Sequence, residues 1–158
     1  MRETLFNWLN PVIAGSRCLD LFAGTGALGF EAASRGAAKV VMVELDPRAL
    51  AELNHIVLRL HAANIRLVQA DTMQWLQTPG ERFDIVFLDP PFHQGLIGPC
   101  CRLLEESGWL SAKAHIYIET ESDLILSLPP SWALQKEGKA GEVRYYLAQQ
   151  NGAHRGYP

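Results

Sequence analysis

The segment Asp89-Pro90-Pro91-Phe92 places an acid, two prolines and an aromatic ring directly after an apolar run, residues 83–88. The run is rich in β-branched and aromatic residues, which predicts a buried strand, and the two prolines predict a rigid, extended loop at its end. In open α/β sheets, ligands bind at the carboxyl ends of the strands. We therefore expect the Asp89 carboxylate, the Pro90 carbonyl and the Phe92 ring to meet at a binding site.

Such a loop suits the alkylation of an amino group attached to a planar ring. This kind of amine is a poor nucleophile because its lone pair is delocalised into the ring. Asp89 and the Pro90 carbonyl could accept its two N–H groups while Phe92 stacks on the ring, which would hold the nitrogen in line with an electrophile. The alternative is a strand that ends in a simple proline turn, with Phe92 in the core.

A second motif predicts a cofactor loop. Residues 18–22 form a short strand candidate, and Gly24, Gly26 and Gly29 follow it with GxGxxG spacing at the start of a predicted helix, residues 27–35. Gly24 and Gly26 allow a positive φ and the close approach of a ligand, while Gly29 lets the helix pack tightly on the strand. This pattern is typical of a nucleotide-containing cofactor.

Two acidic residues narrow the choice of cofactor further. Glu44 ends the next strand candidate, residues 39–43, and lies twenty positions after Gly24, where an acid can bind ribose hydroxyls. Both a dinucleotide and a nucleoside without phosphate fit this pair of motifs. Asp20, just before the glycine loop, would repel a pyrophosphate, but it could bind the ammonium of an amino-acid moiety directly or through water. S-adenosylmethionine is therefore favoured, and its sulfonium is the electrophile that the Asp89 loop requires.

A third acid, Asp71, follows the strand candidate at residues 65–70. Its carboxylate could accept a hydrogen bond from the adenine amino group, with the Thr72 backbone N–H available to the adenine ring. Asp71 is also a good N-cap for a short helix that begins near Thr72. The two roles are compatible.

Together these motifs resemble the RsmD family of bacterial 16S ribosomal RNA guanine-N2 methyltransferases, which belong to the class I S-adenosylmethionine-dependent superfamily. The resemblance spans almost the whole chain and fades after about Gln149. It is carried by the following residues: Arg2-Glu3-Thr4-Leu5-Phe6-Asn7-Trp8-Leu9, the run from Leu19 to Gly29, Glu44, Asp46, Asp71 and Asp89-Pro90-Pro91-Phe92.

The resemblance implies an α/β, Rossmann-like fold with a seven-stranded, mostly parallel sheet, one antiparallel strand and helices on both faces. It implies methyl transfer from S-adenosylmethionine to the N2 amine of a guanine in 16S rRNA of the small ribosomal subunit or its assembly intermediate. The expected catalytic residues are Asp89, Pro90, Pro91 and Phe92. The expected cofactor-binding residues are Asp20, Phe22, Ala23, Gly24, Gly26, Glu44, Leu45, Asp71 and Thr72. No metal is expected.

Charge predicts that any RNA contact is local. The chain has 158 residues and a formal net charge of −3, which argues against broad affinity for nucleic acid. Family members usually carry a basic segment ahead of the stretch that begins here at Arg2, whereas this sequence begins at Met1. Eight basic residues are candidate RNA contacts, and each can also be interpreted as an ordinary surface charge. They are Arg2, Arg48, Arg59, Arg66, Lys136, Lys139, Arg144 and Arg155.

The rest of the sequence predicts one compact domain over residues 1–150 and a loose tail over residues 151–158. Asp46 and Pro47 predict the start of a helix with an apolar face that includes Leu53 and Leu60. Strands at residues 132–137 and 142–149, separated by Gly138-Lys139-Ala140-Gly141, predict a terminal hairpin. The three cysteines have no disulfide or zinc spacing, and no signal peptide or membrane-length apolar run is present. We expect a cytoplasmic monomer.

Three alternatives remain open. DPPF-like loops also suit other planar amines, such as a DNA adenine or a protein glutamine amide. A nicotinamide-dependent oxidoreductase would use the same glycine loop, but the sequence offers it no evident proton donor. A binding protein without catalytic activity would keep the fold and lose the role of Asp89.

Overall fold

The computed structural model describes residues 1–151, which contain one seven-stranded sheet in the order β3-β2-β1-β4-β5-β7-β6. Only β7 is antiparallel to its neighbours, β5 and β6, so the predicted reversed strand is confirmed. The strands are β1 (Arg17–Asp20), β2 (Lys39–Glu44), β3 (Ile65–Gln69), β4 (Phe83–Leu88), β5 (Leu110–Glu121), β6 (Trp132–Ala140) and β7 (Val143–Gln150).

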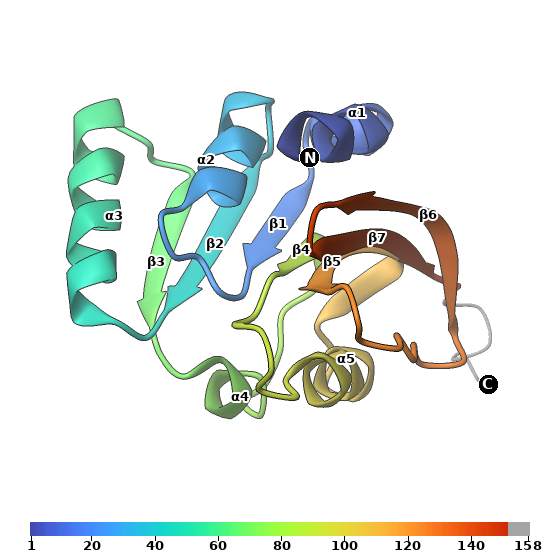
Figure 1. Ribbon diagram of the computed structural model, residues 1–158. Coiled ribbons are helices and arrows are strands. Elements are labelled where there is room, and N and C mark those ends of the chain that lie inside the picture. The colour runs from blue at the N-terminus through green and yellow to red at the C-terminus, as the bar shows by residue number, and fades with distance from the viewer. Residues whose placement is uncertain (152–158) are drawn as a thin grey trace.

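Helices cover both faces of the sheet, as the resemblance implied (Figure 1). They are α1 (Arg2–Ile13), α2 (Ala27–Ser34), α3 (Pro47–Leu60), α4 (Thr72–Trp75) and α5 (Ile97–Glu106). On one face of the sheet, core residues of α1, α2 and α3 pack against the strand side chains. On the other face, core residues of α5 and of the segment just after α4 pack against the strand side chains. This three-layer arrangement buries the parallel strands on both faces.

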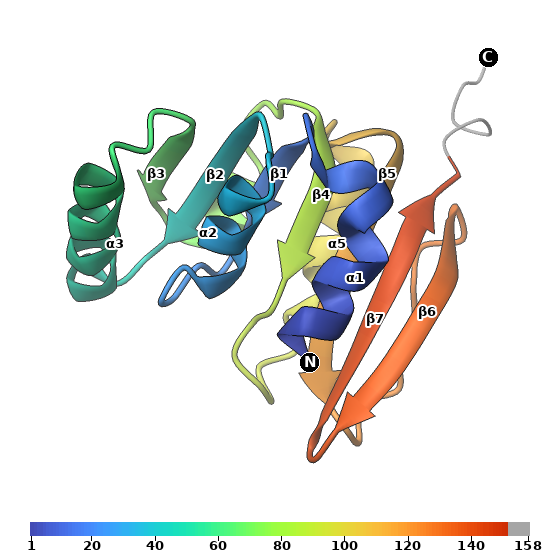
Figure 2. The ribbon, with the colours of Figure 1, turned by 90° about the horizontal axis from the view of Figure 1, so that it is seen from above.

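Helix α1 was not predicted from the sequence. Its buried residues Leu5, Phe6, Leu9 and Ile13 form one apolar stripe with helical spacing, and Phe6 packs against Phe87 of β4 with ring centroids 6.0 Å apart. Figure 2 shows α1 lying across β4 and β5, with its N-terminal end toward the carboxyl ends of these strands. The stripe is the signal that sequence reasoning missed.

The terminal hairpin is confirmed, but its predicted four-residue turn is wrong. Strand β6 continues through Gly138 to Ala140, and these residues pair with β7, so only Gly141 and Glu142 connect the two strands. A Cβ at Gly138 would lie 2.5 Å from the Tyr145 ring. This glycine therefore makes room for an aromatic ring in a cross-strand pair and does not mark the turn. The turn itself is marked by Gly141, which has a φ of +58°.

Helix α3 begins as predicted, because the Asp46 side chain accepts the backbone N–H of Arg48 at 3.0 Å and Pro47 opens the first turn. Its apolar face is narrower than predicted. Leu53 is fully buried, but Leu60 is 58% exposed and lies in the last turn, near the outer edge of the sheet. The apolar pattern alone predicted a wider buried face than α3 has, because α3 covers the edge of the sheet.

The strand order creates a place for a ligand. From β1 the chain moves outward to β2 and β3, then returns to the other side of β1 as β4. The loops that follow β1 and β4 therefore leave adjacent strands in different directions, and a crevice opens between them at the carboxyl edge. Both motifs singled out in the sequence follow these two strands.

No helix in the part of the chain that the structure describes is long and apolar enough to span a membrane. The predicted tail, apart from Asn151, lies outside the described residues.

Candidate active site

A cavity of about 620 Å³ lies at the carboxyl ends of β1, β2, β3 and β4. This volume falls in the range typical of small-molecule sites. Every residue predicted for cofactor binding or catalysis lines it, except Gly26. The walls are Asp20, Leu21, Phe22, Ala23, Gly24, Thr25, Ala27, Leu28, Val43, Glu44, Leu45, Asp71, Thr72, Asp89, Pro90, Pro91, Phe92, Gln94 and Leu96.

Gly24 and Gly26 both have the positive φ that the sequence predicted, +56° and +81°. They differ in what surrounds them. A Cβ at Gly24 would meet only the Phe22 carbonyl at 4.0 Å, whereas a Cβ at Gly26 would lie 2.5 Å from Phe30 and 2.6 Å from Leu53. Gly26 therefore allows α2 and α3 to pack together, and the close approach of a ligand is possible at Gly24.

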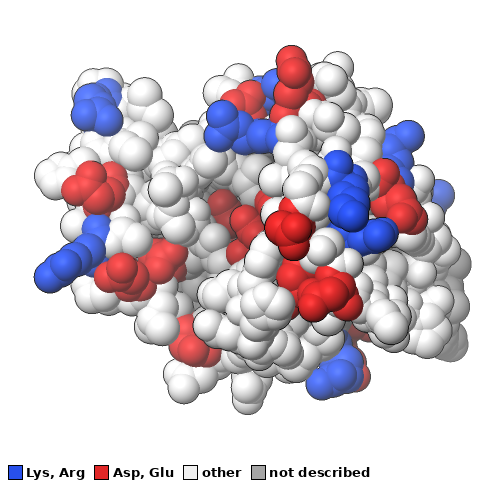
Figure 3. Space-filling model, in the orientation of Figure 1, with Lys and Arg blue, Asp and Glu red and all other residues white. Residues whose placement is uncertain are grey.

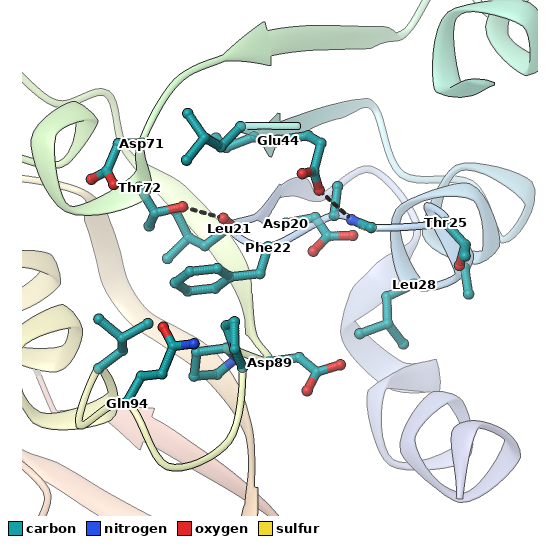
Figure 4. A pocket seen from close by; sticks show the side chains of 18 of the residues that line it. Asp20, Leu21, Phe22, Thr25, Leu28, Glu44, Asp71, Thr72, Asp89 and Gln94 are labelled. Atoms are coloured by element: carbon teal, nitrogen blue, oxygen red, sulfur yellow. Dashed lines mark hydrogen bonds between the residues drawn. The ribbon is translucent and has the colours of Figure 1, made fainter. Parts of the chain in front are cut away.

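Glu44 connects the glycine loop to the loop after β2. One carboxylate oxygen accepts the Gly24 backbone N–H at 2.7 Å, and the other accepts the Asp46 backbone N–H at 2.9 Å. Figure 4 shows the first of these bonds across the upper side of the cavity. Each oxygen keeps a further lone pair, so the carboxylate can still accept hydrogen bonds from hydroxyl groups.

Asp71 and Thr72 lie at the opposite end of the cavity from Thr25 and Leu28 (Figure 4). The Asp71 carboxylate accepts the Gln74 backbone N–H at 3.0 Å, so the predicted N-cap is confirmed. The Thr72 hydroxyl donates to the Leu21 carbonyl at 2.5 Å, which ties α4 to the loop after β1. Asp71 thus both caps a helix and faces the cavity.

Asp20 lies at the bottom of the cavity and is only 2% exposed. Burial, and then the charge of Asp89, raise the pKa of Asp20 to about 7, against the opposing effect of the Gly29 and Phe22 backbone amides. A cation next to this carboxyl group would favour its charged form. The position fits the ammonium-binding role expected from the sequence.

The segment after β4 forms the wall opposite the glycine loop. Pro90 is buried, Asp89 is half-buried and Phe92 is 37% exposed at the rim. Glu121 of β5 holds the far end of this loop, because its carboxylate accepts the His93 backbone N–H at 2.6 Å and lies 3.1 Å from His93 Nδ1. The loop is therefore fixed at both ends.

The cavity is acidic. Asp20, Glu44, Asp71 and Asp89 line it, and no Lys or Arg of the described chain does. Figure 3 shows acidic side chains gathered in the central hollow, with basic side chains on either side of it. Four carboxyl groups suit a ligand that carries positive charge and disfavour a pyrophosphate. The residues present thus fit S-adenosylmethionine better than a dinucleotide.

Some residues of the site were not predicted. Leu21, Thr25, Ala27, Leu28 and Val43 come from the same loops as the predicted residues, and Gln94 and Leu96 continue the loop after β4. Their proximity in sequence to the two motifs was the available signal. Glu119 of β5, whose side chain interacts with Asp89, had no such signal.

The fold and this cavity define a class I methyltransferase, which uses S-adenosylmethionine as its methyl donor, as the sequence predicted. The sequence profile of a family described as "Conserved hypothetical protein 95" matches residues 1–149. The chain belongs to this family, the RsmD methyltransferases, and the resemblance seen in the sequence is confirmed.

Two curated relatives illustrate the match. "Ribosomal RNA small subunit methyltransferase D" of Escherichia coli (strain K12) is 46% identical over 151 residues, which cover 95% of this chain and 76% of that protein. The protein of the same name from Haemophilus influenzae is 45% identical over 153 residues, which cover 94% of this chain and 79% of that protein.

Two solved structures are similar to this chain over most of its length. A "putative methyltransferase yhhF" from Escherichia coli has a TM-score of 0.92 at 45% identity and covers 94% of this chain and 84% of that chain. The "putative methylase HI0767" from Haemophilus influenzae has a TM-score of 0.89 at 44% identity, and the match covers 94% of this chain and 95% of that chain.

Proposed function

We propose that this protein methylates the exocyclic N2 amine of a guanine in 16S rRNA, within the small ribosomal subunit or its assembly intermediate. The observation that carries the proposal is the placement of Asp89-Pro90-Pro91-Phe92 and the glycine loop on opposite walls of one cavity. The names of the two curated relatives described above, which are both ribosomal RNA small subunit methyltransferases, support the class of acceptor.

The cofactor would lie along the cavity between its two ends. We propose that Asp71 and Thr72 bind its adenine, that Glu44 and Leu45 bind its ribose, and that Asp20 faces its ammonium. Gly24 would let the backbone of the loop, with Phe22 and Ala23, approach the methionine portion, while Gly26 acts through the packing of α2. When bound, S-adenosylmethionine supplies an electrophilic methyl group.

The loop after β4 would hold the acceptor. Asp89 and the Pro90 carbonyl would accept the two N–H groups of the amine, which directs the nitrogen lone pair toward the methyl donor. Phe92, which is exposed at the rim, is positioned to stack on a base that has left its helix. Pro91 restricts Pro90 to an extended backbone and so keeps the carbonyl fixed.

Contact with the RNA backbone would be local. Strand register pairs Lys139 with Arg144 near the end of the β6–β7 hairpin, and β7 begins beside Glu121 at the same sheet edge as the catalytic loop. These two residues are better placed for phosphate than Arg66, which lies 3.7 Å from Glu81 at the other end of the strands.

Residues 1–150 would act as one catalytic domain, because all seven strands share a sheet. We also propose that the protein acts as a cytoplasmic monomer, as expected from the sequence. Of the remaining candidate RNA contacts, Arg2, Arg48, Arg59 and Lys136 are exposed, and Arg155 lies outside the described residues.

The test is transfer of labelled methyl groups to small ribosomal subunits that lack the modification, followed by nuclease digestion. Label in N2-methylguanine supports the proposal, and label in another planar amine or in none contradicts it. Asp89→Asn should lower turnover by about 10²-fold, because the amide offers one acceptor oxygen without charge. Asp123→Asn, the same change at an exposed position outside the cavity, is the control.

A further inference from the structure

Strands β4 and β5 bring a second carboxyl group to the catalytic loop. Their parallel register pairs Leu88 with Ile118, so Asp89 and Glu119 follow side by side. Two residues earlier, the rings of Phe87 and Tyr117 meet on the same face with centroids 6.4 Å apart. Because side chains alternate along a strand, Asp89 and Glu119 continue this face, which α1 covers (Figure 2).

The two carboxyl groups interact directly. The Asp89 and Glu119 side chains lie close enough to share a proton, and the Tyr117 hydroxyl lies close enough to Glu119 to act as a donor to it. A hydrogen bond between two carboxyl groups requires a proton on one of them. Burial and then the charge of Asp89 raise the pKa of Glu119 to about 7, whereas the shared bond opposes the effect of burial on the pKa of Asp89. The proton therefore resides on Glu119, which donates to Asp89.

We propose that Glu119 is a positioning residue that holds the Asp89 carboxylate in the orientation needed to accept the substrate amine. This inference rests on the proposed role of Asp89 as that acceptor. Glu119 does not line the cavity, so it acts through Asp89 and does not touch the substrate. Tyr117 is only 1% exposed, and its hydroxyl can donate to Glu119 and so orient it.

The arrangement depends on pH. Below about pH 7, the protonated Glu119 occupies one side of Asp89 and leaves the other side free for an amine N–H. Above this pH, Glu119 ionises, its donor is lost and two like charges lie together beside the acceptor. The amine would then meet a carboxylate that is free to rotate, and turnover should fall with increasing pH.

Other titratable groups face this pair. They are Asp20 from β1, whose pKa Asp89 raises, Tyr145 from β7 beside Tyr117, and the α-amino group of Met1 at the start of α1. Substitution of Glu119 leaves all three in place. The difference between the pH profiles of wild-type and variant enzymes therefore isolates the contribution of Glu119.

The experiment measures kcat and KM for the acceptor between about pH 6 and pH 9, with cofactor affinity measured separately by calorimetry. Glu119→Gln retains a donor for Asp89 without an ionisable proton. It should lose less than about threefold in turnover near pH 6 and show no alkaline decline from this group. Glu119→Ala removes the donor and should lose about 10- to 100-fold in kcat. Glu137→Gln, an exposed glutamate of β6, is the control.

Tyr117→Phe provides an independent measurement. Loss of the hydroxyl that stabilises ionised Glu119 should raise its pKa and move the alkaline decline to higher pH. Wild-type kcat in Glu119→Ala, or an unchanged alkaline decline in Glu119→Gln or Tyr117→Phe, would overturn the inference. The comparison can be made with whichever amine the wild-type enzyme methylates, so a wrong acceptor would refute the proposed function without affecting this test.

Discussion

Replacement of Gly26 by alanine should destabilise the protein through packing and not through the cofactor. Gly26 has φ +81°, and an added Cβ would lie 2.5 Å from Phe30 and 2.6 Å from Leu53. Gly15 is a matched control, because its φ is +79° and a Cβ there would meet no atom within 4 Å. The two substitutions share the backbone cost and differ in the packing cost.

The expected magnitudes follow from these two terms. A left-handed backbone costs an alanine about 1–2 kcal/mol, and overpacking of a well-filled core costs about 1–3 kcal/mol. Gly15→Ala should therefore lower the free energy of unfolding by about 1–2 kcal/mol, and Gly26→Ala by about 2–5 kcal/mol. The entropy that alanine removes from the unfolded chain is common to both variants and cancels in the comparison.

Urea denaturation of both variants, followed by calorimetric titration with S-adenosylmethionine, decides between packing and ligand contact. The structure predicts a larger stability loss in Gly26→Ala and a cofactor affinity within a few fold of wild type wherever the variant is folded. Equal losses in the two variants, or a large loss of affinity in Gly26→Ala without a loss of stability, would refute this reasoning. The second result would restore the ligand contact expected from the sequence.

Three further outcomes follow from the site and the core. Asp71→Asn should keep the cap on α4 yet weaken cofactor binding, whereas Asp71→Ala should also lose about 0.5–2 kcal/mol of stability, as thermal melting and calorimetry would show. Because burial raises the pKa of Asp20 from 3.8 to about 7, ionisation should destabilise the ligand-free protein as the pH rises between these values, and Asp20→Asn should flatten the measured dependence of the unfolding free energy on pH. Burial raises the pKa of Cys18 to about 11 and those of Cys100 and Cys101 to about 12, so a thiol reagent should label them quickly only in urea.

Features determined by short stretches of sequence were predicted well. The strand–glycine–helix unit, the cap at Asp46 and the proline loop after β4 each depend on residues that are close together in the sequence. Their backbone preferences and apolar periodicity are local properties, so one sequence is enough to detect them. The reversed strand followed from the resemblance to a known fold and from the hairpin pattern.

Features that depend on tertiary neighbours were missed or misassigned. Gly26 fits the cofactor motif, but the direction of its Cα–H bond toward Phe30 and Leu53 is set by how α3 packs on α2. Gly138 lies where a turn seemed natural, but its partner Tyr145 explains it. Glu119 is separated from Asp89 by thirty positions, and only the register of β4 and β5 brings the two together.

The acids of the site explain why this fold is suited to bind a cation. Asp20 ends β1, Asp89 directly follows β4, and Glu119 lies close to the end of the neighbouring β5. Burial is the largest cause of the raised pKa of each. Without a ligand, at least part of this group must carry protons at neutral pH, because three adjacent buried carboxylates would repel one another. A positively charged ligand reverses that preference for the carboxyl group it faces. The arrangement that weakens the ligand-free protein is therefore the same one that selects S-adenosylmethionine over a dinucleotide, and a hydrophobic replacement of these acids would gain stability at the expense of that selectivity.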